Sequence, residues 1–543
     1  MSIREITTKP YLDQKPGTAG LRKKVAVFQQ PHYLENFLQS IFDCVPELKG
    51  ATVVMGGDGR YHNRDAIRAA IGIAAANGVA RVVVGQGGLL STPAAAHLIR
   101  KLGAAGGFLF TASHNPAGPD GDFGIKFNVA GGGQAGEGLT ERIYGASKRI
   151  TRYRSIDEVE IDLDRRTTQQ VGPMQVEVVD CVEDYAQLMQ SLFDFDRMRD
   201  WIKRGNGLRF DAMHAATGPY AQRILVEQLG APPAAVLNGS PLEDFGGGHP
   251  DPNLVHGQHL VELAFGEGAP QLVAASDGDG DRNMILGRGI FVSPGDSLAI
   301  LAAHLPRLPG YRDGLKGIAR SMPTSRAADR VAAAMNVPLF ETPTGWKFFC
   351  NLLDSGQVTI CGEESFGTSS AHAREKDGLW AVLAWLNVLA LTGKTVAEIA
   401  DEHWRRHGRH YFQRLDYEEL AGPAAEAVMQ AFSGSLANLQ GRTLADFEVT
   451  LADEFGYHDR IDGSVAVGQG LRVVCGDQAR IVMRLSGTGT KGATLRVYLE
   501  RYERDPTALH WRPEDALAPL AAAAEKLGRI GELTGRRAPT LVT

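Results

Sequence analysis

One pattern occurs three times in this chain: an apolar strand, a loop of small residues, a helix of about three turns and a second strand. The first copy combines strands at 52–55 and 80–84 with a helix at 65–76. Two further copies occupy 208–237 and 317–340. A helix that connects two strands in this way is typical of a parallel or mixed sheet. The pattern therefore predicts three similarly built α/β domains.

The last part of the chain follows a different pattern. From about residue 411, helical segments alternate with amphipathic strands such as 481–485 and 494–499, and an Ala/Leu-rich helix occupies 517–527. We therefore expect a fourth, α+β domain. A chain of 543 residues is too long for one core, which agrees with several domains of about 100–200 residues each. The expected domains are 1–185, 186–300, 301–410 and 411–543.

Composition excludes several classes of function. The net charge of −6 does not attract nucleic acid or an anionic membrane, so any positive charge that binds an anionic substrate must be local. The five scattered cysteines form no C-x-x-C pair and fit neither a disulfide framework nor a zinc site. The most apolar run, 381–391, is too short to cross a bilayer, and the N-terminus lacks the apolar core of a signal peptide. We expect a soluble cytoplasmic protein.

Three aspartates at alternate positions, Asp277, Asp279 and Asp281, follow a short apolar strand and are separated by glycines. Such a loop can fold around one hard cation. An EF-hand loop would need Gly at its sixth position and Glu at its twelfth, where this chain has Arg282 and Arg288. The alternative is an acidic surface turn, but three like charges repel one another unless a cation binds. The loop therefore predicts a Mg²⁺ site that is open to a phosphate oxygen.

Ser113 lies in a short polar loop directly after an apolar strand at 106–110. A serine in this place either caps a turn or acts as a nucleophile. The hydrolase elbow G-x-S-x-G is absent, because Thr111 and Asn115 replace its glycines. We do not expect Ser113 to pair with His114, because adjacent side chains generally diverge. A phosphorylated Ser113 that faces the metal explains more of the sequence.

Two further loops carry groups that suit a phosphorylated sugar. Glu363 and Ser365 stand in a glycine-bracketed loop, where a carboxylate can accept hydrogen bonds from vicinal hydroxyls. The stretch 484–490 combines an arginine, hydroxyls and glycines, which suits a phosphate cradle although it is not a Walker A loop. An exposed acidic turn and a plain Gly/Ser/Thr turn remain the alternatives. The basic loop at 15–24 is a weaker candidate for a phosphate contact.

Taken together, the motifs Thr-Ala-Ser-His-Asn-Pro, Asp-Gly-Asp-Gly-Asp-Arg, Gly-Glu-Glu-Ser-Phe-Gly and Arg-Leu-Ser-Gly-Thr-Gly-Thr resemble those of the α-D-phosphohexomutase superfamily. They occur in that family's order and rough spacing, across nearly the whole chain. The chain length and the stretches 366–368 and 344–347 are most similar to the long phosphoglucomutase branch of animals, yeast and some bacteria. The stretch 370–373, which follows the sugar loop, differs from the sequence that is more common in the family at this place.

The resemblance implies an α/β protein with four domains around a central cleft, each contributing one loop. Ser113 would be the phosphoserine, Mg²⁺ would be bound by the three aspartates and a phosphoryl oxygen on Ser113, and Arg282 would lie beside the transferred group. His114, Lys126 and Lys376 would be candidates for general base and acid, in no order that the sequence fixes. The implied substrate-binding residues are Arg22, Thr344, Gly345, Glu363, Ser365, Lys376, Arg484, Ser486, Gly487, Thr488 and Arg496.

The activity that this resemblance implies is the interconversion of α-D-glucose 1-phosphate and glucose 6-phosphate. The reaction would proceed through a phosphoserine enzyme and a glucose 1,6-bisphosphate intermediate. The alternatives are a phosphomannomutase or phosphoglucosamine mutase on the same scaffold, a Mg²⁺-dependent phosphatase, and a non-catalytic interaction protein. The expected partner is a small phosphosugar, with no nucleic acid or membrane, and the expected state is a monomer with a dimer as the alternative.

Overall fold

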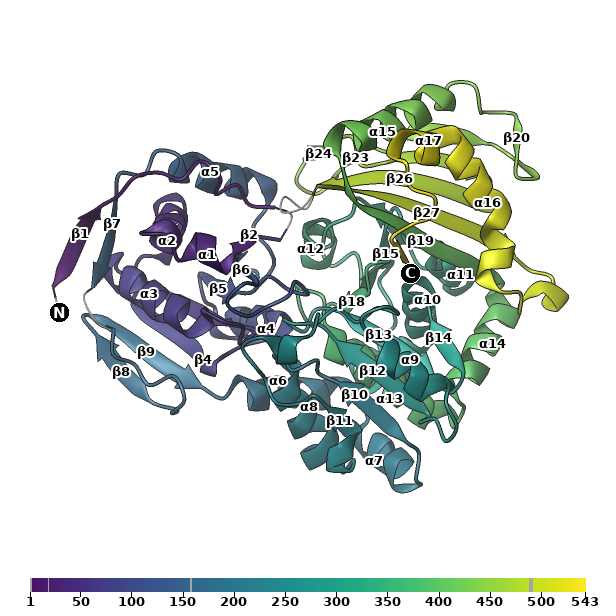
Figure 1. The fold of residues 1–543 in the computed structure, drawn as a ribbon. Coiled ribbons are helices and arrows are strands. Elements are labelled where there is room, and N and C mark those ends of the chain that lie inside the picture. Colours follow the sequence, from purple (N-terminus) through teal and green to yellow (C-terminus); the bar gives the residue numbers. More distant parts are fainter. Residues whose placement is uncertain (1, 18, 157–158, 488–491) are drawn as a thin grey trace.

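The computed structural model describes residues 2–17, 19–156, 159–487 and 492–543 of the chain. Three mixed β-sheets and one antiparallel sheet, each covered by helices, make up the fold (Figure 1). The expected fold class, three α/β units followed by a different C-terminal unit, is confirmed. Because the polar loops of the first three units follow parallel strands, they lie at the carboxyl ends of those strands, where open α/β sheets bind ligands.

The first unit contains a seven-stranded mixed sheet. Its strands are β2 (Leu21–Lys24), β3 (Thr52–Gly57), β4 (Arg81–Leu89), β5 (Gly106–Phe110), β6 (Asp122–Val129), β8 (Thr168–Val171) and β9 (Met174–Val179). Their order is β2-β6-β5-β3-β4-β9-β8, with parallel pairs at the centre and antiparallel pairs at both edges. A separate ribbon pairs β1 (Ile3–Thr7) with β7 (Arg152–Ile156). The helices are α1 (Val25–Phe28), α2 (Tyr33–Cys44), α3 (Asn63–Ala76), α4 (Thr92–Leu102) and α5 (Glu137–Ser147).

The second unit repeats this plan on a smaller scale. Its strands are β10 (Leu208–Asp211), β11 (Val236–Leu237), β12 (Leu272–Ser276), β13 (Asn283–Gly287) and β14 (Ile290–Val292). They are ordered β11-β10-β12-β13-β14, and the pairs that involve β10 are parallel. Its helices are α6 (Cys181–Leu192), α7 (Phe195–Lys203), α8 (Thr217–Ala221) and α9 (Gln258–Phe265).

One helix of the second unit differs from its expected form. The sequence predicts a regular helix at 219–229, but α8 continues into the π-helix η2 (Gln222–Gln228). The amide of Leu229 donates to the carbonyl of Ile224, five residues back. Apolar spacing over so short a stretch does not distinguish the two helix types, so the sequence carried no signal for the wider turn.

The third unit has four strands in the order β16-β15-β17-β18, of which only the last pair is antiparallel. These strands are β15 (Ile318–Ser321), β16 (Leu339–Thr342), β17 (Ile360–Glu363) and β18 (Gly367–Ser370). Its helices are α10 (Pro294–His304), α11 (Ala327–Met335), α12 (Lys347–Asp354), α13 (Gly378–Thr392) and α14 (Val396–His407).

Helix α13 connects the second and third units. Twelve of its residues are buried, and it contacts β12 and β13 of the second sheet as well as β18 of the third. A helix that is apolar on every face must be buried on every face, which explains its composition. Asp377 caps its N-terminus by accepting a hydrogen bond from the amide of Trp380 (3.0 Å). This cap fixes the position of Lys376, one residue earlier.

The fourth unit is an antiparallel sheet in the order β22-β25-β26-β27-β19-β28. Its strands are β19 (Arg409–Leu420), β22 (Leu451–Glu454), β25 (Leu471–Cys475), β26 (Ala479–Gly487), β27 (Ala493–Glu503) and β28 (Leu541–Val542). Helices α15 (Gly422–Leu436), α16 (Pro513–Gly528) and α17 (Ile530–Thr534) pack together against the sheet (Figure 1). Two short ribbons pair β20 (Thr443–Leu444) with β21 (Phe447–Glu448) and β23 (Tyr457–His458) with β24 (Val465–Ala466).

The structure can also be compared with what the sequence predicts about membrane-spanning helices and cysteines. Within the described ranges no single helix is long and apolar enough to cross a membrane. Helices α13 and α14 pass the length and composition test only as a pair, and that pair is bent by 85°. All five cysteines are free thiols, and all but Cys44 are buried.

Candidate active site

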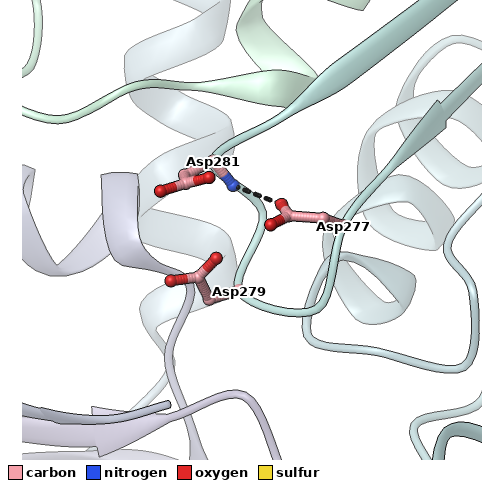
Figure 2. Close-up of side chains that lie close together, drawn as sticks. All are labelled: Asp277, Asp279 and Asp281. Carbon is pink, nitrogen blue, oxygen red and sulfur yellow. Dashed lines mark hydrogen bonds between the residues drawn. The ribbon is translucent and has the colours of Figure 1, made fainter. Parts of the chain in front are cut away.

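The aspartate loop connects β12 to β13 and is buried. Asp277, Asp279 and Asp281 are 0%, 1% and 2% exposed, and each offers an oxygen within 4.8 Å of the others. The amides of Asp281 and Arg282 both donate to Asp277 Oδ1 at 2.9 Å, which curls the loop around one carboxylate (Figure 2). Gly280 provides the positive φ of 82° that the tight turn requires.

The electrostatics of this loop favour a bound cation. Burial, together with the charges of Asp281 and Asp279, raises the pKa of Asp277 well above its ordinary value. Asp279 Oδ1 and Asp281 Oδ1 are buried and have no hydrogen-bond partner among the described residues. Convergent carboxylates with unpartnered oxygens form the donor set that hard divalent cations prefer. The residues present therefore fit a metal ion, and the loop is a candidate metal site.

Ser113 lies directly against this loop. Its hydroxyl donates to Asp277 Oδ2 at 2.9 Å and lies 3.3 Å from His114 Nδ1. The expectation that Ser113 and His114 diverge is therefore wrong. Ser113 has a φ of +54°, in the left-handed region, and this unusual backbone conformation brings the two neighbouring side chains together.

Two lysines reach the aspartates from different units. Lys126 Nζ on β6 is 2.7 Å from Asp279 Oδ2 and 3.6 Å from Asp281 Oδ2, while Lys376 Nζ is 3.2 Å from Asp281 Oδ2. Burial opposes the charge on Lys126, but Asp279 and Asp281 outweigh it, so the pKa of Lys126 lies above its ordinary value. The Lys126 side chain is therefore an ammonium at neutral pH.

His114 shows the opposite shift. Burial, with the nearby charges of Arg282 and Arg22, holds the pKa of His114 well below its ordinary value. A neutral imidazole results, and its Nδ1 lies 3.3 Å from the Ser113 hydroxyl. Of the three candidate proton-transfer groups, His114 is the one whose described side chain contacts Ser113.

Two arginines line the same region. Arg282 Nη1 donates to Asp251 Oδ1 at 2.9 Å, while its buried Nε has no hydrogen-bond partner within the described part of the chain. Burial disfavours the charged form, but Asp251, Asp277 and Asp281 outweigh it and the pKa of Arg282 lies above its ordinary value. Arg22 on β2 lies close enough to Asp279 and Asp281 for their charges to favour its protonated form, although burial lowers the pKa of Arg22 overall.

The predicted sugar loop lies at the end of β17. Glu363 is buried, and its Oε1 accepts a hydrogen bond from the amide of Gly345 at 2.8 Å, so the segments 344–347 and 362–367 meet as expected. Burial raises the pKa of Glu363 despite the charge of Lys376. Thr344 Oγ1 is buried without a hydrogen-bond partner in the described ranges, and Ser365 is half-buried in the same loop. These polar groups are available to a ligand.

The predicted phosphate cradle lies on the fourth sheet. Arg484 and Ser486 are half-buried residues of β26, and Gly487 is its last residue. Arg484 stands opposite Arg496 of β27, which places two guanidinium groups side by side on one face. Arg496 Nε lies 3.7 Å from Asp416. Thr488 lies outside the described residues.

The structure adds site residues that the sequence analysis missed. Thr92 Oγ1, at the start of α4, donates to Asp279 Oδ2 at 2.7 Å, and Asp251 orients Arg282. Thr92 follows a parallel strand, so a search of all carboxyl strand ends could have found it. Asp251 lies in an irregular loop, and the sequence carries no comparable signal for it.

A buried serine that faces a carboxylate triad, on three α/β units and an antiparallel fourth, fits the phosphohexomutase class, which comparisons with known proteins show. The models of phosphoglucomutase/phosphomannomutase α/β/α domains I, II and III match residues 13–154, 183–289 and 294–407. The C-terminal domain model of phosphoglucomutase-1 matches residues 409–540. The chain belongs to the phosphoglucomutase/phosphomannomutase family.

Within that family, several relatives that match over their full length are named phosphoglucomutases. The phosphoglucomutase of Rhizobium radiobacter is 53% identical over 541 residues, and rabbit (Oryctolagus cuniculus) phosphoglucomutase-1 is 48% identical over 565, with 100% of both chains covered each time. The crystal structure of pp63/parafusin, a phosphoglucomutase from Paramecium, is 46% identical with a TM-score of 0.93, covering 100% of this chain and 99% of that one.

Proposed function

We propose that this protein interconverts α-D-glucose 1-phosphate and glucose 6-phosphate through a phosphorylated Ser113 and a glucose 1,6-bisphosphate intermediate. The observation that carries the proposal is the contact between the Ser113 hydroxyl and Asp277, at the edge of a buried carboxylate triad. The names of the full-length relatives, at 48–53% identity, support it.

The reaction consists of two phosphoryl transfers. In the first, the bond between phosphorus and Ser113 Oγ breaks as the bond to the free sugar hydroxyl forms, and that hydroxyl loses its proton to a base. The bisphosphate then reorients and returns its other phosphoryl group to Ser113, whose hydroxyl must lose a proton. His114, with Nδ1 3.3 Å from Ser113 Oγ, would accept that proton in the tautomer that leaves Nδ1 unprotonated. Such transfers depend mainly on alignment and charge neutralisation, which the Lys126 ammonium and Arg282 supply.

Asp277, Asp279 and Asp281 would hold Mg²⁺ together with a phosphoryl oxygen on Ser113. A bound Mg²⁺ would neutralise charge that develops on the transferred phosphoryl group. The same loop presents Arg282 beside it, held by Asp251.

The remaining predicted residues divide into two groups. Glu363, Ser365, Thr344 and Gly345 would read the sugar hydroxyls, since a site built on such contacts discriminates against an epimer that cannot make them. Lys376 would lie between these groups and the aspartates. The phosphate that is not being transferred would be bound by Arg22, Arg484, Ser486, Gly487, Thr488 and Arg496. The paired arginines suit a dianion, because charge-assisted hydrogen bonds are the strong ones.

The test is turnover of glucose 1-phosphate with Mg²⁺ and trace glucose 1,6-bisphosphate, beside mannose 1-phosphate and an assay for released inorganic phosphate. We expect glucose 6-phosphate as the main product, weak turnover of the mannose epimer and little free phosphate. Faster turnover of mannose 1-phosphate would contradict the assignment to glucose. Stoichiometric release of inorganic phosphate would show a phosphatase.

We also propose that the protein acts as a cytoplasmic monomer on this small phosphosugar, and that its domains divide at about residues 185, 300 and 410. The separate family-model matches support a division into four domains, with gaps at 155–182 and 290–293 that lie shortly before the first two of these positions. Light scattering tests the oligomeric state, and limited proteolysis tests the divisions.

A further inference from the structure

A pair of opposite charges is completely buried behind the serine loop. Asp58 and Arg60 lie between β3 and α3, are 0% and 1% exposed, and pair through Arg60 Nε at 2.9 Å from Asp58 Oδ2. Desolvation of two charges offsets most of their attraction, so a buried ion pair is weak evidence for stability alone. Neither residue belongs to a motif that the sequence marks as functional.

The outer atoms of this pair reach the backbone of Ser113. Arg60 Nη2 donates to the Ser113 carbonyl at 2.8 Å, and Arg60 Nη1 donates to the Asp122 carbonyl at 2.7 Å. Thr111 Oγ1 donates to Asp58 Oδ2 and accepts a hydrogen bond from the Ser113 amide at 2.7 Å. Both peptide groups that flank the Ser113 side chain are therefore held, one directly by Arg60 and the other by Asp58 through Thr111.

These contacts fix a backbone conformation that serine rarely adopts. The φ of +54° at Ser113 lies in the left-handed region, where the Cβ atom crowds the following carbonyl. Residues in such conformations persist only when the surrounding structure holds them in place. The same conformation places the Ser113 hydroxyl against both Asp277 and His114.

The second unit also contacts this arrangement. The ring of Phe245 lies 5.3 Å from the Arg60 guanidinium, and the amide of Tyr61 donates to the Glu243 carbonyl at 2.7 Å. A Cβ atom at Gly278, in the aspartate loop, would lie 2.4 Å from the Ser113 carbonyl oxygen. The carbonyl that Arg60 holds is thus the one on which the aspartate loop packs.

We propose that Asp58, Arg60 and Thr111 are positioning residues for phosphoryl transfer, which hold Ser113 in its left-handed conformation against the aspartate loop. This inference rests on the proposed function. The bonds by which they reach Ser113 go to its backbone and not to its hydroxyl, so they hold the serine in the same place with and without its phosphoryl group. The dephosphorylated hydroxyl therefore stays aligned to receive the phosphoryl group back from the bisphosphate.

The test uses two substitutions at one position. Thr111→Val keeps the size of the side chain but removes both hydrogen bonds, whereas Thr111→Ser keeps the hydroxyl. We expect Thr111→Val to lower kcat about 100-fold, the size of effect that small misplacements of reacting groups produce. The KM for glucose 1-phosphate should stay unchanged, because Thr111 is not among the residues proposed to bind the substrate. Phosphorylation of Ser113 by glucose 1,6-bisphosphate should slow in parallel, and Thr111→Ser should restore both rates.

Arg60→Lys is a second test of the positioning role, and Arg320→Lys is its matched control. Arg320 is 3% exposed and pairs with Asp329 and Glu341, far from Ser113 in the chain and without a contact to it. We expect both variants to lose thermal stability but only Arg60→Lys to lose kcat. Wild-type kcat in Thr111→Val, or equal losses of kcat in the two arginine variants, would overturn the positioning role. A wild-type protein that does not turn over glucose 1-phosphate would instead refute the proposed function.

Discussion

Glu500 joins the fourth unit to the third, and removing its charge gives a sharp test of how firmly they are coupled. This β27 carboxylate is 1% exposed. It accepts hydrogen bonds from the amide of Arg326 at 2.6 Å and from His410 Nδ1 at 2.8 Å, and pairs with Arg480 Nη2 at 2.9 Å. Glu500→Gln keeps the shape but removes the charge that pairs with the buried Arg480 guanidinium and with Arg326 Nε at 3.2 Å. Removing one partner of a buried ion pair costs about 3–5 kcal/mol.

Hydrogen exchange of the β26 and β27 amides measures this loss locally. At about 1.36 kcal/mol per factor of ten, the predicted loss of protection exceeds about 100-fold. The matched control is Asp477→Asn, which removes an interdomain ion pair with Arg330 (3.2 Å) at a site where Asp477 is 79% exposed. An exposed pair contributes about 0–1 kcal/mol, so the control should change protection by about fivefold at most. Equal effects of the two substitutions would refute the coupling.

The pH dependence of this effect has a definite sign. Burial opposes the charge on Glu500, but Arg480, Arg326 and His410 outweigh it and hold the pKa of Glu500 well below its ordinary value. A depressed folded-state pKa stabilises the fold above the unfolded-state pKa of about 4.3, and this contribution is lost as the pH falls further. The stability difference between wild type and Glu500→Gln should therefore be constant near neutral pH and shrink below about pH 4.3. A difference that grows on acidification would contradict the assignment.

Three further substitutions test the other parts of the site. Asp279→Asn removes a carboxylate of the candidate metal site, so the Mg²⁺ concentration that gives half-maximal activity should rise by at least about tenfold. An unchanged Mg²⁺ concentration would exclude the loop as the metal site. Arg496→Met removes a charged hydrogen-bond donor. The KM for glucose 1-phosphate should rise about tenfold or more, since such bonds contribute about 1.5–3 kcal/mol. An unchanged KM would show that the phosphate binds elsewhere. Glu363→Gln should reduce the preference for glucose over mannose 1-phosphate, and a constant ratio of rates would remove Glu363 from sugar recognition.

Much of the fold follows from local patterns. The apolar run at 106–110 is the fully buried strand β5, and the uniformly apolar stretch at 378–391 is the buried helix α13. Each of these segments carries its own signal in its length, because a fully buried strand is short, whereas a buried helix extends over about ten residues or more. The aspartate loop was likewise recognisable, because its three carboxylates are close in sequence as well as in space.

The contacts that complete the site depend on long-range packing and on backbone conformation. Thr92 is 187 positions from Asp279, with which it forms a hydrogen bond, and nothing in the local sequence of either residue shows that the two meet. The contact between Ser113 and His114 depends on a positive φ that serine does not favour by itself. That conformation comes from Arg60 and Asp58, more than fifty positions earlier in the chain.

The most direct test of the account is to identify the residue that carries the phosphoryl group. The protein would be incubated with glucose 1,6-bisphosphate labelled in its phosphates, digested, and its labelled peptide sequenced by mass spectrometry. The account predicts label on Ser113, loss of that label on adding glucose 6-phosphate, and neither label nor turnover in Ser113→Ala. Label on another residue, or full turnover by Ser113→Ala, would contradict it.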